Sequence, residues 1–450
     1  MAAAGLALAL LAPSAQAAEI SWMKGFDDPE TPNALDRVGV LKVGPKRAKN
    51  VLVLNPGTSS SAAYFKPLAR TVVRESRRRW QVWAVERREN RLEDHSVLDR
   101  AKRGAATGEE LFDYYLGWLT DPYVEEHFEL IPDSEVAFAR GWGLKVEIGD
   151  LRLVVRAAAK RDRRVVLGGH SLGGSITTAY ATWDFNGRAG ARDLSGLLYI
   201  DGGSNPTPVT PEQATESLDA LEMGSPWLAF GGIGAPFLGI FSATGSTGTV
   251  VNPSDVSLGW SFPLLPANLK PPVEPTNEAQ FGYAVDADTS PPSLIAAQVN
   301  AGRLADAGEP RGWERADEIT PLRRYAKMLS GTGVRGADGT AWYHPQRLTI
   351  DARSVANGNA NPAQEILDVN ATHGDDLRRR TRIYAFGAAL GGEGVLESAR
   401  ALAEQSSIPK RNLTLVNREA TYTHNDPRSA HPENAFVDRL SPFLRKVSRR

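Results

Sequence analysis

The stretch "VVLGGHSLGGS" (165–175) decides how this sequence of 450 residues is interpreted. An apolar run ends in two glycines, a His-Ser pair follows, and two more glycines come after a single leucine. Glycine loses more backbone entropy on folding than other residues, so several together indicate a place where Cβ atoms would clash. A strand that ends in Gly-x-Ser-x-Gly before a helix ("SITTAYATWDF", 175–185) makes a tight turn that lifts the serine hydroxyl to the carboxyl edge of a sheet. Ser171 is therefore the candidate nucleophile.

The rest of the chain supplies strands and helices for such a sheet. Continuous apolar runs, typical of strands buried on both faces, are "NVLVLN" (50–55), "WQVWAVE" (80–86), "RVVLGG" (164–169), "GLLYID" (196–201), "RIYAFG" (382–387) and "NLTLVN" (412–417). Apolar residues recur at helical spacing over 143–161, and 433–446 is interpreted as a closing helix. Strands that alternate with helices predict an α/β fold with a mostly parallel, doubly wound sheet.

A large insertion rich in Pro and Gly interrupts this alternation. The predicted organisation is a signal peptide (1–17), an N-terminal part of the core (18–203), a cap or lid insertion (204–376) and a C-terminal part of the core (377–450). The insertion contains the apolar stretch "WLAFGGIGAPFLGIF" (227–241). With 15 residues, four glycines and a proline, this stretch is interpreted as a buried cap segment and not as a membrane span.

Charge, cysteine content and the first residues restrict the class of protein. The formal net charge of −1, from 52 basic and 53 acidic residues, gives no overall field that favours nucleic acid or an anionic membrane. Without cysteine the chain has no disulfide, no thiol nucleophile and no thiolate metal ligand. "LALALLA" (6–12) followed by Ala15-Gln16-Ala17 has the apolar core and cleavage pattern of a signal peptide. We expect cleavage after Ala17 and a secreted or periplasmic protein.

On these residues the chain resembles the α/β-hydrolase superfamily, and "GHSLGG" (169–174) is similar to the serine turn of its lipases and esterases. The resemblance covers the predicted core and not the insertion. "VLVLNPGTSSSAAYFKPLA" (51–69) is similar to the first conserved loop of the superfamily, although Asn55-Pro56-Gly57-Thr58 replaces the usual His-Gly-x. The resemblance implies an α/β-hydrolase fold with a large cap insertion.

Two backbone N–H groups are expected to hold an oxyanion. The N–H of Leu172 follows the serine, where the start of a helix adds a partial positive charge. The resemblance makes the N–H of Thr58 the second donor. Ser59 is the alternative, because the absent histidine leaves the shape of this loop open.

A serine hydroxyl needs a base within hydrogen-bond reach before it can attack. The superfamily places this base after the last strand and before the final helix, which is the place of His424 in "TYTHNDPRSAHPENAFVDRLSPFL" (421–444). His431 lies nearer the helix and is interpreted as a surface residue. His170 adjoins the serine but is expected to pack on the other side of the turn. The remaining histidines lie in polar or loop stretches typical of the surface: His95, His127, His344 and His373.

The acid that orients this base is left open between two residues. Asp201 ends the run "GLLYID" and is followed by two glycines. Glu393, in "FGAALGGEG" (386–394), follows the next strand, where the superfamily more often carries its acid. The superfamily acid usually lies closer to the strand end, where this chain has Leu390. We favour Asp201 and keep Glu393 as the alternative.

These residues predict an exported serine hydrolase that cleaves carboxylic esters through an acyl-enzyme. Aromatic residues of the insertion favour hydrophobic acyl or aryl groups: Trp227, Phe230, Phe237, Phe262 and Trp342. A serine peptidase or an acyltransferase would use the same residues, and a non-catalytic binding protein on this scaffold is the third alternative. The predicted chemistry needs no cofactor and no metal. The expected partner is a small-molecule ester, with no nucleic acid and no stable membrane insertion.

Overall fold

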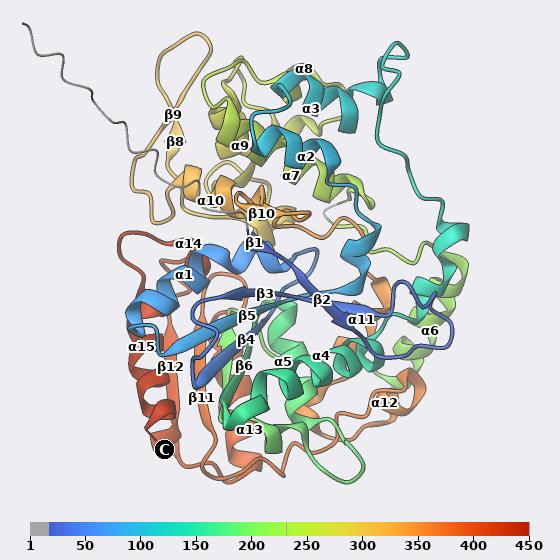
Figure 1. The fold of residues 1–450 in the computed structure, drawn as a ribbon, viewed down its shortest axis with the longest axis vertical. Helices are drawn as coiled ribbons and strands as arrows, with labels where there is room; N and C mark the ends of the chain where they lie inside the picture. Colours follow the sequence, from blue (N-terminus) through green and yellow to red (C-terminus); the bar gives the residue numbers. More distant parts are fainter. Residues whose placement is uncertain (1–17, 231, 450) are drawn as a thin grey trace, which may run out of the picture.

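An eight-stranded sheet forms the centre of the molecule (Figure 1). The computed structural model describes residues 18–230 and 232–449, so the predicted signal peptide (1–17) lies outside the described residues. The strands are β2 (Ser21–Lys24), β3 (Arg37–Val43), β4 (Asn50–Asn55), β5 (Trp80–Glu86), β6 (Arg164–His170), β7 (Gly196–Ile200), β11 (Arg382–Gly387) and β12 (Leu413–Asn417).

The order of the strands across the sheet is β12–β11–β7–β6–β4–β5–β3–β2. All neighbouring pairs are parallel except the two that β3 makes, with β2 and with β5. A mostly parallel sheet with helices on both faces confirms the predicted α/β-hydrolase fold.

The central strands are buried on both faces, as their continuous apolar sequence predicts. In β4, Val51 and Val53 belong to the hydrophobic cluster on one face of the sheet, while Leu52 and Leu54 belong to the cluster on the other. Burial of each such side chain contributes roughly 1.5–3 kcal/mol relative to exposure. β4 also pairs with β5 and β6 along both edges, so neither its side chains nor its backbone reach water.

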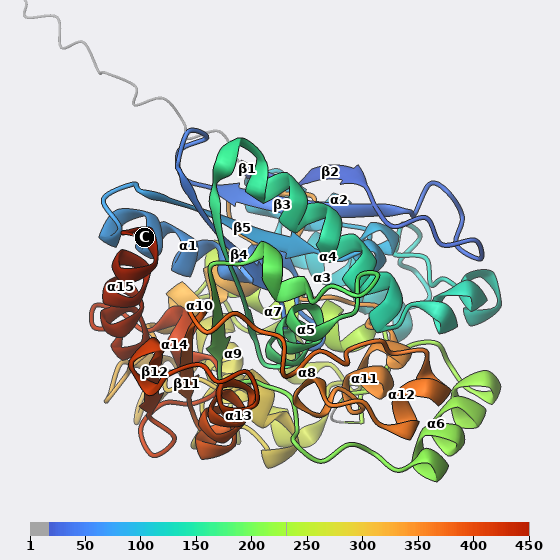
Figure 2. The same ribbon diagram turned by 90° about the horizontal axis from the view of Figure 1, so that it is seen from below.

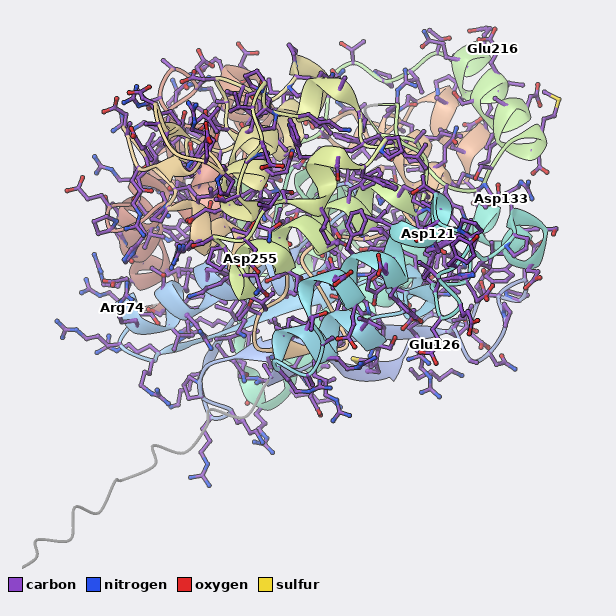
Figure 3. The ribbon with its side chains drawn as sticks, turned by 90° about the horizontal axis from the view of Figure 1, so that it is seen from above. Arg74, Asp121, Glu126, Asp133, Glu216 and Asp255 are labelled. Carbon is purple, nitrogen blue, oxygen red and sulfur yellow. The ribbon has the colours of Figure 1, made fainter. Side chains whose placement is uncertain are left out.

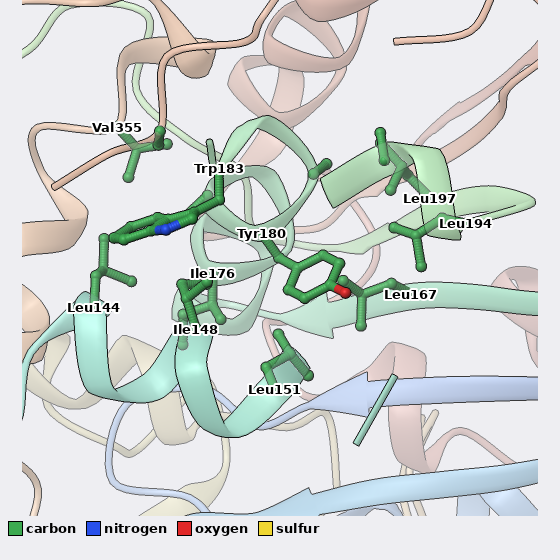
Figure 4. Close-up of a cluster of buried hydrophobic side chains, with 14 of the residues drawn as sticks. Leu144, Ile148, Leu151, Leu167, Ile176, Tyr180, Trp183, Leu194, Leu197 and Val355 are labelled. Atoms are coloured by element: carbon green, nitrogen blue, oxygen red, sulfur yellow. The ribbon is translucent and has the colours of Figure 1, made fainter. Parts of the chain in front are cut away.

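Helices form the two outer layers. The helices α1 (Lys66–Glu75) and α15 (Ala435–Ser448) cover one face, and α4 (Leu144–Ala159), α5 (Leu172–Thr182) and α13 (Gly392–Gln405) cover the other. Figure 4 shows how α4 packs against α5 in this second layer, through Leu144, Ile148 and Leu151 of α4 and Ile176 and Tyr180 of α5. All five side chains are fully buried, which fixes α5 and the serine turn at its start.

The cap lies above the carboxyl edge of the sheet and is built from two separate parts of the chain (Figure 1). The segment between β5 and α4 contributes α2 (Ser96–Lys102) and α3 (Gly108–Tyr115). The insertion contributes α7 (Phe237–Val251), α8 (Leu258–Ser261), α9 (Asn277–Val285) and α10 (Leu322–Leu329). One hydrophobic cluster joins the two parts: it contains Leu111 and Tyr115 from the first, and Ile240, Phe262 and Trp342 from the second. The segment after β5 is therefore part of the cap.

The two ends of the insertion pack beside the core. The helices α6 (Pro211–Met223), α11 (Gln346–Ala352) and α12 (Pro362–Leu367) lie together at one side of the sheet, as Figure 2 shows. Leu221, Leu348 and Leu367 belong to the same hydrophobic cluster as α4 and α5. These three helices therefore pack against the core of the fold.

Short elements complete the fold. β1 (Ala18–Glu19) pairs with β10 (Val334–Arg335), β8 (Arg303–Leu304) pairs with β9 (Trp313–Glu314), and α14 (Asp426–Ser429) precedes α15. In the described part of the chain, none of the helices combines the length and the apolar character that crossing a bilayer requires.

The exterior of the cap is acidic along the segment after β5. Residues 104–139 contain nine Asp and Glu residues and no Lys or Arg. Asp121, Glu126 and Asp133 are exposed there and are labelled in Figure 3, which views the molecule from the cap side. Clustered negative charge on this face opposes the approach of anionic surfaces.

Candidate active site

Ser171 lies in a strained turn between β6 and α5. Its backbone angles are φ 56° and ψ −128°, a conformation that residues other than glycine adopt rarely. The turn packs too tightly for side chains on either side. A Cβ atom on Gly173 would lie 2.3 Å from the Asn55 carbonyl oxygen, and one on Gly202 would lie 2.0 Å from the carbonyl oxygen of Ser171. Contacts around the turn therefore require glycine at both positions, Gly173 in the motif and Gly202 after β7.

Asp201 and His424 form a buried pair next to this turn. The Nδ1 atom of His424 lies 2.6 Å from Oδ2 of Asp201, and the two side chains are 1% and 0% exposed. This hydrogen bond leaves Nε2 as the imidazole nitrogen that is free to act on a substrate. The distance places the two residues in the geometry that a base and its orienting acid require.

Three backbone N–H groups hold the other side of the Asp201 carboxylate. Ala388, Leu390 and Gly391, in the loop after β11, donate at 2.7, 3.2 and 3.0 Å. Burial alone would raise the pKa of Asp201, but the hydrogen bonds from His424 and from this backbone outweigh burial and lower the pKa below its usual value. The carboxylate therefore stays ionised although it is buried.

Glu393, the alternative acid, is not brought to the histidine. Its carboxylate accepts hydrogen bonds from Arg400 at 2.6 Å and from the Asn417 side chain at 3.0 Å. It lies at the start of α13, where it faces solvent. Of the two carboxylates that the sequence leaves open, only Asp201 contacts His424.

The serine hydroxyl and the two expected oxyanion donors are unpaired. Within the described residues, no hydrogen bond uses the Ser171 hydroxyl or the N–H groups of Leu172 and Thr58, and the N–H of Ser59 is likewise unused. A contact between serine and base often forms only when a substrate is bound. Gly57 lies directly against the serine, because a Cβ atom there would be 2.9 Å from the Ser171 Cβ. The loop that carries Thr58 therefore borders the nucleophile.

Arg87 fixes the shape of this loop from beneath. It is 1% exposed, and its guanidinium donates to the carbonyl oxygens of Pro56, Gly57 (3.0 Å) and Ser60 (3.5 Å). Carbonyl groups that point down to the guanidinium leave the N–H groups of the loop free to face the other way. Arg87 was not predicted as a functional residue, although it lies in a charged stretch directly after a buried strand, which is an unusual place for an arginine.

His170 connects the loop that carries Thr58 to the loop that carries His424. Its Nε2 lies 2.9 Å from the backbone oxygen of His424, and its Nδ1 lies 3.4 Å from the Tyr64 hydroxyl. That hydroxyl also accepts a hydrogen bond from the N–H of Gly57 at 2.7 Å. These partners assign the imidazole proton to Nε2. Burial, with smaller contributions from Arg428 and His424, lowers the pKa of His170 well below its usual value, so the ring stays neutral.

Asp426 joins the loop that carries His424 to the insertion. Its buried carboxylate accepts hydrogen bonds from Thr423 (2.8 Å), from the Thr320 hydroxyl (2.7 Å) and from the Asn300 side chain (2.6 Å). Thr320 and Asn300 belong to the insertion, whereas Thr423 directly precedes His424. The insertion is therefore hydrogen-bonded, through Asp426, to the residue that precedes His424.

Two histidines that the sequence assigns to the surface are buried. His95 is 8% exposed and contacts Glu93 and Asp338, while His344 is 1% exposed. The prediction was wrong because it rested on the polar neighbours in the sequence, whereas the burial of His95 comes from tertiary contacts such as that with Asp338, 243 residues away. His127 is partly exposed and stacks on Trp118, with 4.4 Å between ring centroids.

Comparison with known proteins finds similarity among solved structures. No protein-family model matches the sequence, and no curated protein matches it. Among solved structures it is similar to a protein from Sulfolobus solfataricus provisionally named a lipase, at 16% identity over 96% of this chain and 93% of that one, with a TM-score of 0.46. It is also similar to an alpha/beta hydrolase fold protein from Nakamurella multipartita, at 12% identity over 95% of this chain and 99% of that one, with a TM-score of 0.42. A thermophilic esterase from Thermogutta terrifontis is similar at 12% identity over 96% of this chain and 98% of that one, with a TM-score of 0.38.

The class of the molecule follows from its own architecture. A mostly parallel sheet, helices on both faces and a Gly-x-Ser-x-Gly turn between a strand and a helix define the α/β-hydrolase fold. The predicted α/β-hydrolase fold is therefore confirmed.

Proposed function

We propose that the protein is an exported serine hydrolase that cleaves carboxylic esters with hydrophobic acyl or aryl groups. The observation that carries this proposal is the buried Asp201–His424 hydrogen bond of 2.6 Å, next to a strained Ser171 at the carboxyl edge of the sheet. Nucleophile, acid and base follow one another along the chain (Ser171, Asp201, His424) in the order that α/β-hydrolases use.

In the proposed reaction the Ser171 oxygen attacks the ester carbonyl while Nε2 of His424 accepts its proton. The ionised Asp201 keeps the proton of the neutral imidazole on Nδ1 and stabilises the imidazolium that forms. The tetrahedral intermediate then expels the alcohol, which takes the proton from Nε2. Water attacks the acyl-enzyme by the same route and releases the acid and the free serine. No metal or organic cofactor takes part in these steps.

The oxyanion of the intermediate would be held by the N–H groups of Leu172 and Thr58, with Ser59 as the alternative to Thr58. Each of these groups lacks a partner within the described residues, so it can bind an oxygen without breaking an existing bond. Arg87 and Tyr64 hold this loop before the substrate arrives. Donors fixed in advance cost no reorganisation during the reaction.

A cavity in the cap supports the hydrophobic acyl group. Its volume is about 690 Å³, and its wall is mostly apolar, with Phe112, Phe241, Phe262, Leu265 and Leu329 among its residues. Neither Ser171 nor His424 lines it. Leu294 and Ala297 at its wall belong to the segment whose Ala296 carbonyl oxygen accepts the side-chain amide of Asn425, the residue after the base. The cavity wall is therefore hydrogen-bonded, through Ala296, to the residue that follows the proposed base.

Export is proposed from the first residues of the sequence. Cleavage after Ala17 would leave β1 intact, because this strand begins at Ala18, whose N–H donates to the Gly333 carbonyl oxygen at 2.9 Å. N-terminal sequencing of protein recovered outside the cytoplasm should begin at Ala18. Full-length protein confined to the cytoplasm would contradict this part of the proposal.

The function is tested with nitrophenyl esters of increasing acyl length on the purified mature protein. We expect turnover of esters and no measurable turnover after Ser171→Ala, which removes one hydroxyl and leaves the turn intact. Matched nitroanilides and an added alcohol acceptor distinguish peptidase and acyltransferase activity. Ester turnover that persists in Ser171→Ala, or faster turnover of the amides than of the esters, would overturn the proposal.

A further inference from the structure

Glu93, His95 and Asp338 form a buried cluster outside the proposed active site. Nε2 of His95 lies 3.1 Å from a carboxylate oxygen of Glu93 and 3.2 Å from one of Asp338. The three side chains are 1%, 7% and 0% exposed. Among the described residues, this is the one group in which three such ligand atoms lie within 4.8 Å of one another. One imidazole thus faces two buried carboxylates.

The distances in this cluster suit a bound metal ion. Nitrogen and oxygen ligands bind Zn²⁺ at about 2.0–2.2 Å, so neighbouring ligand atoms of a tetrahedral site lie about 3.3–3.6 Å apart. The two separations at His95, 3.1 and 3.2 Å, are slightly shorter than this range. A metal ion on the Nε2 lone pair would therefore reach both carboxylates with little movement. An imidazole ligand favours zinc and similar transition metals over Mg²⁺ or Ca²⁺.

The carboxylates are held in place by further hydrogen bonds. The backbone N–H of Trp342 donates to Glu93 at 2.7 Å, and its indole N–H donates to Asp338 at 2.8 Å. The backbone N–H of Thr340 donates to the other oxygen of Asp338 at 2.6 Å. Such outer contacts orient the ligands of metal sites.

A cavity gives solvent access to the cluster and contains an unpaired acceptor. The cavity has a volume of about 330 Å³ and is lined by Glu93 and His95. Asn90 lines the same cavity, is 5% exposed, and has an amide oxygen without a hydrogen-bond partner among the described residues. An orphaned amide oxygen beside two carboxylates is a further oxygen donor for a cation or for its bound water.

The charge around the cluster is also negative. Glu86 is buried next to it, where it accepts hydrogen bonds from the N–H of Ala62 and from Asn90. Together with Glu93 and Asp338, it brings a third buried carboxylate close to His95. A divalent cation would offset the cost of burying these carboxylates together.

We propose that Glu93, His95 and Asp338 bind a zinc ion, with water from the cavity completing its coordination. Binding releases the proton that Nε2 of His95 shares with the two carboxylates, and the metal takes its place. The inference is independent of the proposed hydrolase activity, since none of the three residues belongs to that site.

The zinc ion would fasten the cap to the loop that borders the nucleophile. Glu93 and His95 follow β5, whereas Asp338 belongs to the insertion. The hydroxyl of Ser61 donates to the backbone oxygen of Asp338, and the N–H of Ala341 donates to the carbonyl oxygen of Ser59 at 3.0 Å. The proposed site therefore lies directly behind the oxyanion loop, and its role is structural.

The test uses the untagged mature protein, stripped of metal by chelator and then titrated with Zn²⁺ alone. Elemental analysis after desalting should give about one zinc per chain in the wild type. The zinc titration should show an affinity at least tenfold lower in His95→Gln and in Asp338→Asn than in the wild type. The matched control is His373→Gln, which removes another histidine that pairs with a carboxylate, that of Asp184 at 3.3 Å. Zinc at a hundredfold excess over its Kd should raise the Tm of the wild type by about 3 °C.

A measurement on the wild type avoids dependence on whether the variants fold. Co²⁺ in place of zinc should give visible absorption bands that disappear on addition of Zn²⁺. The proposal is overturned by a wild-type chain that binds no stoichiometric zinc, which would mean that a protonated His95 alone balances the carboxylates. Zinc retained in a folded His95→Gln, or lost in His373→Gln, would overturn it as well.

Discussion

The strands β7 and β11 end at the same edge of the sheet, and a carboxylate follows each of them, yet the two carboxylates lie in opposite environments. Asp201 is buried and accepts hydrogen bonds from His424 and from three backbone N–H groups. Glu393 is 44% exposed and pairs with Arg400. Backbone N–H groups of the loop after β11 donate to Asp201, whereas Glu393, at the start of the helix that follows this loop, faces solvent.

This difference shows what selects an orienting acid. Strand position alone does not distinguish Asp201 from Glu393 as the orienting acid, because both follow strands that end beside the serine turn. The N–H groups of Ala388, Leu390 and Gly391 all converge on one point, and the carboxylate that reaches this point stays ionised while buried. The direction of these donors therefore selects Asp201.

The largest expected effect is the difference between Asp201→Asn and Glu393→Gln. An amide at position 201 cannot stabilise the imidazolium, and it favours the wrong tautomer of His424, so kcat should fall on the order of 10⁴-fold. Glu393→Gln breaks an exposed ion pair, so kcat should change by less than about tenfold. Both variants are assayed on one nitrophenyl ester. A collapse in Glu393→Gln with an active Asp201→Asn would reverse the comparison.

A second pair contrasts a tyrosine hydroxyl that has partners with one that has none. Tyr64→Phe leaves the Gly57 N–H without an acceptor and His170 without its hydroxyl contact, at about 1–3 kcal/mol for each unpaired buried group. We expect kcat to fall about 10–100-fold, because the oxyanion loop loses its anchor. Tyr180→Phe is the control, since the Tyr180 hydroxyl is buried without a partner in the described structure. Equal losses in the two variants would show that Tyr64 contributes only packing.

A third pair compares a glycine in the wall of the cap cavity with one at the surface. Gly245 lines the cavity, and a Cβ atom there meets nothing closer than a Phe281 ring carbon at 3.8 Å. Gly245→Leu should fill the cavity and lower kcat/KM for long acyl esters by roughly tenfold relative to short ones, within the usual range for lost apolar pocket contacts. Gly394→Leu, in open space on α13, is the control. An unchanged chain-length profile in Gly245→Leu would place the acyl group elsewhere.

The smallest effect concerns the pH dependence of stability at His170. The folded protein lowers the pKa of this group, so between the folded and unfolded pKa values the unfolded state binds more protons. The resulting stabilisation is complete above the ordinary histidine pKa of about 6.5 and is lost as the pH falls below it, by up to about 1.4 kcal/mol per pH unit.

Equilibrium urea unfolding of the wild type and of His170→Gln between pH 7.5 and about 5 measures this slope. The free energy of unfolding should fall more steeply with acidification in the wild type. His373→Gln serves as the comparison, because His373 is partly exposed. Parallel curves for the wild type and His170→Gln would mean that His170 titrates normally in the folded state.

The six strands expected from apolar runs are all present, because continuous apolar sequence carries the information for strands buried on both faces. The strands β2 and β3 were not predicted. They lie at the edge of the sheet, where "SWMK" (21–24) is largely exposed and the buried centre of "RVGVLKV" (37–43) is flanked by charged residues. Edge strands with mixed sequence give a weak periodic signal.

Part of the proposed site could be predicted from local sequence. The Gly-x-Ser-x-Gly turn predicts Ser171 as the nucleophile, and the position between the last strand and the final helix predicts His424 as the base. The contacts of Arg87, Tyr64 and His170 could not be predicted, because each joins residues that are far apart in the chain. The composite cap was missed because the segment after β5 lacks a strong pattern of its own and becomes buried only against the insertion.

The most direct test of the account is covalent labelling with a fluorophosphonate, which forms a bond from an activated serine oxygen to phosphorus and releases fluoride. Intact-mass spectrometry of the mature protein should show one adduct per chain, mapped by peptide analysis to Ser171. We predict that Ser171→Ala abolishes this adduct and that Asp201→Asn slows its formation far more than Glu393→Gln does. An adduct that forms at the wild-type rate in Ser171→Ala, or ester turnover in a wild-type protein that takes up no label, would contradict the proposed mechanism.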